Sequence, residues 1–188
     1  AVGVWKRVLN SVDRTTLYNA GSGLEYASLN ASPSINIISP SSYQVIQRNG
    51  SNQASIAITG TYGGTPTSIE ASWNGGVYAT IVTSPSGGIF SGTLLNQNAG
   101  QGTLTVRFTN DTSISNSKSY VGIGDIFIVA GQSNAMGAGT NNQAYSNPTY
   151  KATMFGNDDQ WKELVDPLDD YTNQVDLVSR DAPADGAT

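Results

Sequence analysis

The chain has 188 residues, a formal net charge of −5 and only 12% charged residues, a length that suits one or two domains. So few basic groups argue against nucleic acid as a partner, because little would neutralise the phosphates. Cysteine is absent, which excludes disulfides, and the longest apolar run is too short to span a bilayer, so no membrane partner is expected.

The first 33 residues show the weakest pattern. Residues 4–10 and 15–29 could form one or two strands around a turn at 19–23. They could belong to a stem, to the end of another module, or to the domain that follows. Residues 1–33 are therefore assigned as an N-terminal segment of uncertain role.

Residues 34–123 predict an immunoglobulin-like β-sandwich, because short strands alternate with turn signals at spacings of roughly 8–12 residues. The predicted strands are 55–60, 68–73, 77–82, 89–95, 103–108 and 119–124. Alternation turns these side chains inward: Ile56, Ile58, Ile69, Ala71, Trp73, Leu104, Val106 and Phe108. Asn74-Gly75 predicts a tight hairpin turn. The cysteine pair usual in such sandwiches is missing, so the likeness is to the architecture alone.

Residues 124–188 differ in character from the sandwich. The apolar run at 126–130 predicts a strand buried on both faces of a parallel sheet. Residues 151–164 predict a strand, an acidic turn at 157–159 and a short return strand. Asp158 and Asp159 are interpreted as turn residues and 166–170 as a solvated loop, because neither stretch has the spacing of a calcium loop. No metal is expected.

A serine follows the apolar run directly, in the stretch "GQSNAMGAG". Gly131 allows a tight turn, and Ser133 would begin a helix, where its own N–H and the helix dipole favour an oxyanion. Gly137 leaves room for a substrate to approach the backbone. The alternative is a strand-to-helix turn in which Ser133 only caps the helix. The stretch is neither a phosphate-binding loop nor a dinucleotide fingerprint, and it only approximates the G-x-S-x-G elbow.

The block Gly-Gln-Ser-Asn, followed by small residues and a methionine, resembles the first motif of the SGNH-hydrolase superfamily. It is most similar to the sialate O-acetylesterase-like branch of carbohydrate esterases. The resemblance covers about residues 124–170. Ala135 stands where many members have methionine, and Met136 follows one place later. The subfamily, and therefore the sugar that carries the acetyl group, is left open.

This resemblance implies a mixed fold: the immunoglobulin-like sandwich, then the first part of an α/β/α, flavodoxin-like SGNH esterase domain at 124–188. It implies that Ser133 removes O-acetyl groups from sialic acid or another acetylated polysaccharide, with its backbone N–H as an oxyanion donor. Gln132 and Asn134 would orient the loop or contact the acetylated glycan substrate. No cofactor is implied. The expected location is extracellular or on a cell or virion surface, in a bacterium or phage.

The base that such a serine needs is missing, because the chain contains no histidine. The family is expected to supply it from an Asp-x-x-His block, and the Ser-x-x-Lys alternative fails at Met136. Residues 124–188 are also too few for a doubly wound sheet. We therefore expect the N-terminal piece of a nicked or split esterase, whose second polypeptide fragment carries Asp-x-x-His. A deliberately shortened chain is the alternative.

Two rival functions stay open at this point. The sandwich could be a carbohydrate-binding or adhesin module in which Tyr43, Tyr62 and Tyr78 stack on sugars. It could also be a structural stalk of a surface or phage-tail assembly. Trp161 could line a sugar site or pack in a core, and Trp73 is expected in the core.

Overall fold

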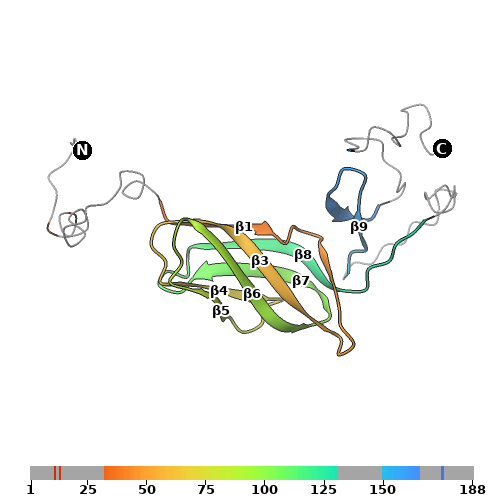
Figure 1. Ribbon diagram of the computed structural model, residues 1–188, viewed down its shortest axis with the longest axis horizontal. Coiled ribbons are helices and arrows are strands. Elements are labelled where there is room, and N and C mark those ends of the chain that lie inside the picture. The colour runs from red at the N-terminus through yellow and green to blue at the C-terminus, as the bar shows by residue number, and fades with distance from the viewer. Residues whose placement is uncertain (1–10, 12, 14–31, 131–149, 166–174, 176–188) are drawn as a thin grey trace.

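The computed structural model describes residues 11, 13, 32–130, 150–165 and 175 (Figure 1). Within these residues the chain forms ten strands. They are β1 (Ser34–Ser39), β2 (Val45–Gln47), β3 (Gln53–Gly63), β4 (Ser68–Trp73), β5 (Ala79–Thr83), β6 (Ile89–Asn98), β7 (Gly100–Phe108), β8 (Ser115–Gly124), β9 (Thr153–Phe155) and β10 (Trp161–Glu163). The first eight build a sandwich, and the last two form a separate hairpin.

The sandwich consists of two facing sheets (Figure 1). One has the strand order β1-β3-β6, and the other has the order β2-β8-β7-β4-β5. All neighbours are antiparallel except β2 and β8, which are parallel. The chain changes sheets between β1 and β2, next to the cis Ser39–Pro40 peptide bond. This arrangement is compatible with an immunoglobulin-like sandwich.

The core fills the space between the two sheets. Its members include Ile56 and Ile58 from β3 and Leu104, Val106 and Phe108 from β7, all nearly inaccessible to solvent. The predicted inward faces of these strands are confirmed, as is that of β4 with Trp73. Each such aliphatic or aromatic side chain stabilises the fold by roughly 1.5–3 kcal/mol when it is removed from water.

Two local features explain how the strands fit together. Asn74 and Gly75 have φ values of 51° and 73°, and the Gly76 N–H donates to the Trp73 carbonyl at 3.0 Å, which confirms the predicted tight turn. In the other sheet Gly60 lies opposite Phe90, and a Cβ at Gly60 would overlap the phenyl ring. The glycine thus lets the ring lie across the strand pair.

The second hairpin confirms the prediction for residues 151–164. Strands β9 and β10 are antiparallel, and the rings of Phe155 and Trp161 meet edge to face with centroids 5.6 Å apart. Asp159 adopts a positive φ of 55° in the turn, and the Asp158 carboxylate accepts a hydrogen bond from the Gln160 N–H at 3.3 Å. The acidic pair therefore serves the turn, as predicted.

The α/β/α part of the predicted fold class is wrong for the residues that the structure describes. Stretches 32–130 and 150–165 contain strands and loops but no helix, and no flavodoxin-like layer is seen. The run at 126–130 is not a strand either. Phe127 is 81% exposed and Ile128 is 93% exposed. An apolar run forms a buried strand only where neighbouring strands pair with it and cover its side chains. No described strand pairs with residues 126–130, so the prediction of a buried strand is wrong.

Candidate functional site

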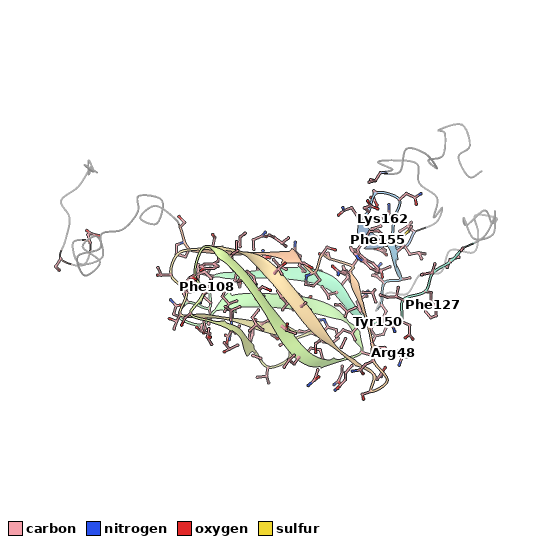
Figure 2. All side chains as sticks on the ribbon, in the orientation of Figure 1. Arg48, Phe108, Phe127, Tyr150, Phe155 and Lys162 are labelled. Carbon is pink, nitrogen blue, oxygen red and sulfur yellow. The ribbon has the colours of Figure 1, made fainter. Side chains whose placement is uncertain are left out.

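The predicted site residues Gly131, Gln132, Ser133, Asn134 and Gly137 lie outside the described residues. The structure does describe the chain that leads to the serine motif and the chain that follows it. Arg48, Phe127 and Tyr150 all lie at one end of the sandwich, the end opposite Phe108 (Figure 2). The contacts that hold these two flanks make up the described surroundings of the motif.

The first flank is held by a cluster that we name the entry anchor: Gln47, Arg48, Asp125 and Ile126. Arg48 Nε and Nη2 donate to the two carboxylate oxygens of Asp125 at 3.0 and 2.8 Å. Gln47 Nε2 donates to Asp125 Oδ1 at 3.2 Å, and Gln47 Oε1 accepts the Ile126 N–H at 2.8 Å. A planar guanidinium matches a carboxylate in this two-point geometry, so the anchor fixes direction as well as position.

Strand pairing explains why the entry anchor forms. Strand β2 runs parallel to β8 with Gln47 opposite Gly124, so the residues that follow each strand emerge side by side. Hydrogen bonds from Arg48, and then from Gln47, lower the pKa of Asp125 below its ordinary value. The carboxylate is therefore ionised at neutral pH and keeps its partners.

The second flank is held by the exit anchor, which consists of Gln101, Lys151 and Glu163. Gln101 Nε2 donates to the Lys151 carbonyl at 2.9 Å, and the Lys151 N–H donates back to Gln101 Oε1 at 2.7 Å. The side-chain amide thus pairs with the backbone as a neighbouring strand would. Lys151 Nζ forms an ion pair with Glu163 at 2.8 Å, and this contact raises the pKa of Lys151. Hairpin β9–β10 is tied to β7 in this way.

A stacked pair of tyrosines lies beside the exit anchor. The rings of Tyr43, from the β1–β2 connection, and Tyr120, from β8, have centroids 4.9 Å apart and planes 13° apart. Their φ values are 65° and 58°, in the left-handed region that non-glycine residues rarely adopt. Burial raises the pKa of Tyr43, and the charge of Glu163 raises it further.

The three tyrosines predicted to stack on sugars do not share one surface patch. Tyr62 packs edge to face on Phe108, with centroids 6.4 Å apart. The Arg107 guanidinium lies 3.5 Å from the ring centroid of Tyr78, so each has a partner within the protein. Only Tyr43 lies near the serine flanks, and Tyr120, which the sequence did not single out, stacks on it.

The described part of the chain contains no cluster of histidine, cysteine, aspartate and glutamate suited to a metal ion. Within the same residues, no helix has the length and hydropathy of a membrane span. In comparisons with known proteins, no family model matches this chain and no curated protein matches it either.

Proposed function

We propose that this chain carries the nucleophile of a serine esterase that removes O-acetyl groups from carbohydrate. The observation that carries the proposal is the Gly-Gln-Ser-Asn block at 131–134, directly after an apolar run. The two anchors are compatible with the proposal, because they hold Asp125, Ile126 and Lys151, on either side of this block in the chain, at one end of the sandwich.

The proposed chemistry is acyl transfer in two steps. The Ser133 hydroxyl oxygen attacks the acetyl carbonyl carbon while a histidine takes the hydroxyl proton. The tetrahedral intermediate then expels the sugar oxygen, which receives that proton from the histidine. Water, activated by the same histidine, hydrolyses the acetyl-serine to acetate and restores the hydroxyl. The Ser133 N–H serves as one oxyanion donor, and losing such a donor typically costs about 3–4 kcal/mol.

The histidine must come from outside these 188 residues, because they contain none. We propose that a further polypeptide segment, carrying an aspartate–histidine pair, supplies it at the sandwich end that bears the two anchors. We also propose that the enzyme acts outside the cell or on a cell or virion surface, where polymeric glycans are found.

The test is hydrolysis by the chain together with its histidine-bearing segment. Release of acetate from p-nitrophenyl acetate and from an O-acetylated sialic acid is measured for the wild type and for Ser133→Ala. The proposal predicts a loss of at least about 1000-fold for Ser133→Ala on both substrates. Ser86→Ala, in the exposed β5–β6 connection, is the matched control and keeps full activity.

Equal hydrolysis by the wild type and Ser133→Ala would leave the esterase proposal without its nucleophile. We propose no second function. Tyr62 and Tyr78 have partners within the sandwich, so the structure does not support a sugar-binding surface built from Tyr43, Tyr62 and Tyr78 together.

A further inference from the structure

The tyrosine pair has a geometry that its packing role alone does not require. One face of the Tyr120 ring is covered by Tyr43, while the residue as a whole is 38% exposed. Solvent therefore reaches Tyr120 elsewhere than at the ring face that Tyr43 covers. Both residues hold a left-handed φ, which costs of order 1–3 kcal/mol each and is concentrated at ligand clamps and active sites.

The groups around the pair are those that recognise a sugar. An aromatic face is negative, and the C–H groups on one face of a pyranose ring carry partial positive charge, so the two attract while water is excluded. Lys151 and Glu163 lie beside the pair with side chains 30% and 34% exposed. A charged donor and a charged acceptor at the edge of an apolar platform can bind sugar hydroxyl groups.

The position of the pair connects it to the serine motif. Lys151 interacts electrostatically with both tyrosines, and it belongs to the exit anchor that holds the chain after the motif. The pair therefore lies beside residue 151, and Tyr150 lies at the same sandwich end as Arg48 and Phe127, which precede the motif (Figure 2). We propose that Tyr120, supported by Tyr43, is a stacking subsite for a sugar ring of the glycan substrate.

This inference rests on the proposed function for the class of ligand, but binding can be tested apart from catalysis. The experiment uses the chain with its histidine-bearing segment and with Ser133→Ala, so that ligand is not consumed. Two probes are titrated by calorimetry, an O-acetylated sialyllactose and an acetylated xylo-oligosaccharide. Saturation-transfer NMR on the same samples reports which sugar protons contact aromatic rings.

The expected result is that Tyr120→Ala raises the Kd of at least one probe about tenfold or more. Tyr120→Phe keeps the ring face and stays within about threefold of the parent. Tyr78→Ala removes a half-buried tyrosine that packs against Arg107 instead, and it leaves the Kd unchanged. Hydrogen exchange of the Lys151 amide, measured in each variant, shows whether the exit anchor is still formed.

The inference is overturned if neither probe binds the parent, or if Tyr120→Ala binds as tightly as the parent. It is also overturned if Tyr120→Ala weakens binding only because the exit anchor is lost. Faster exchange of the Lys151 amide in Tyr120→Ala than in Tyr120→Phe would reveal that loss. Failure of the esterase proposal gives a different result. Ser133→Ala would then keep full hydrolysis, while the Kd of the probes would still depend on Tyr120.

Discussion

At Gly60 the absence of a single methyl group lets Phe90 lie across strands β3 and β6. A Cβ there would overlap both the Asn36 carbonyl oxygen and the phenyl ring, and neither can move without disturbing the sheet. We predict that Gly60→Ala lowers the free energy of unfolding by about 1–3 kcal/mol.

Chemical denaturation monitored by tryptophan fluorescence measures this change. Gly50→Ala is the matched control, because a Cβ at Gly50 meets nothing within 4 Å and the expected change stays within about 0.5 kcal/mol. Equal stability of the two variants would mean that the sheet relaxes around the methyl group.

Single residues also mark where sequence reasoning succeeds and where it stops. The alternation around Ile56, Ile69 and Leu104 predicts the buried faces correctly, because a strand with one buried face has a period of two. Tyr120 carries no comparable signal. Its exposure depends on a left-handed φ and on Tyr43, which is distant in sequence, and neither can be read from neighbouring residues.

At the scale of elements, the entry anchor links the ends of β2 and β8 through one ion pair. Arg48 lowers the pKa of Asp125 below its ordinary value of 3.8. Because the folded-state pKa lies below the unfolded value, the pair stabilises the fold above the unfolded value. That contribution disappears as the pH falls through the lowered folded-state pKa.

We predict that a carbon-detected NMR titration of the Asp125 carboxyl gives a pKa below 3.8 in the wild type. In Arg48→Ala the pKa should move back toward the ordinary value, and the Ile126 amide should exchange faster. An Asp125 pKa that is the same in both proteins would contradict the assignment of the anchor.

Elements also differ in how much of them could be predicted. The hairpin β9–β10 follows from its own residues, since the turn chemistry at Asp158 and Asp159 is local. The sequence pattern does not predict strands β1 and β2. In β1 the apolar Ile38 stands at an outward position, where it is 61% exposed, so apolar and polar residues do not alternate strictly. Strand β2 has only three residues. The docking of the hairpin through Gln101 depends on a tertiary contact that no local pattern encodes.

At the scale of the whole molecule, the largest departure from expectation is the apolar run that precedes the serine motif. Ile126, Phe127, Ile128 and Val129 are 45%, 81%, 93% and 74% exposed. Contiguous exposed apolar side chains of this kind bind hydrophobic probes and promote association, whereas single exposed ones do not. Local hydropathy predicts a buried strand here, but it does not show whether other strands pair with the run and cover it.

We predict that the 188-residue chain binds the dye ANS and self-associates at high concentration. The double substitution Phe127→Ser and Ile128→Ser should lower dye fluorescence by about half, because it replaces two of the four exposed apolar side chains. Val77→Ser, outside the run and 93% exposed, is the control and should change nothing. Identical fluorescence and sedimentation in all three proteins would show that the run is not an accessible surface.

The most direct test of the central claim is covalent capture of the nucleophile. The chain and the proposed histidine-bearing segment are treated with a fluorophosphonate probe, and the labelled peptide is identified by mass spectrometry. We expect one adduct, on Ser133, that is absent from Ser133→Ala and suppressed by an O-acetylated sugar. Labelling of a different serine in a protein that still hydrolyses the acetyl ester would contradict the account.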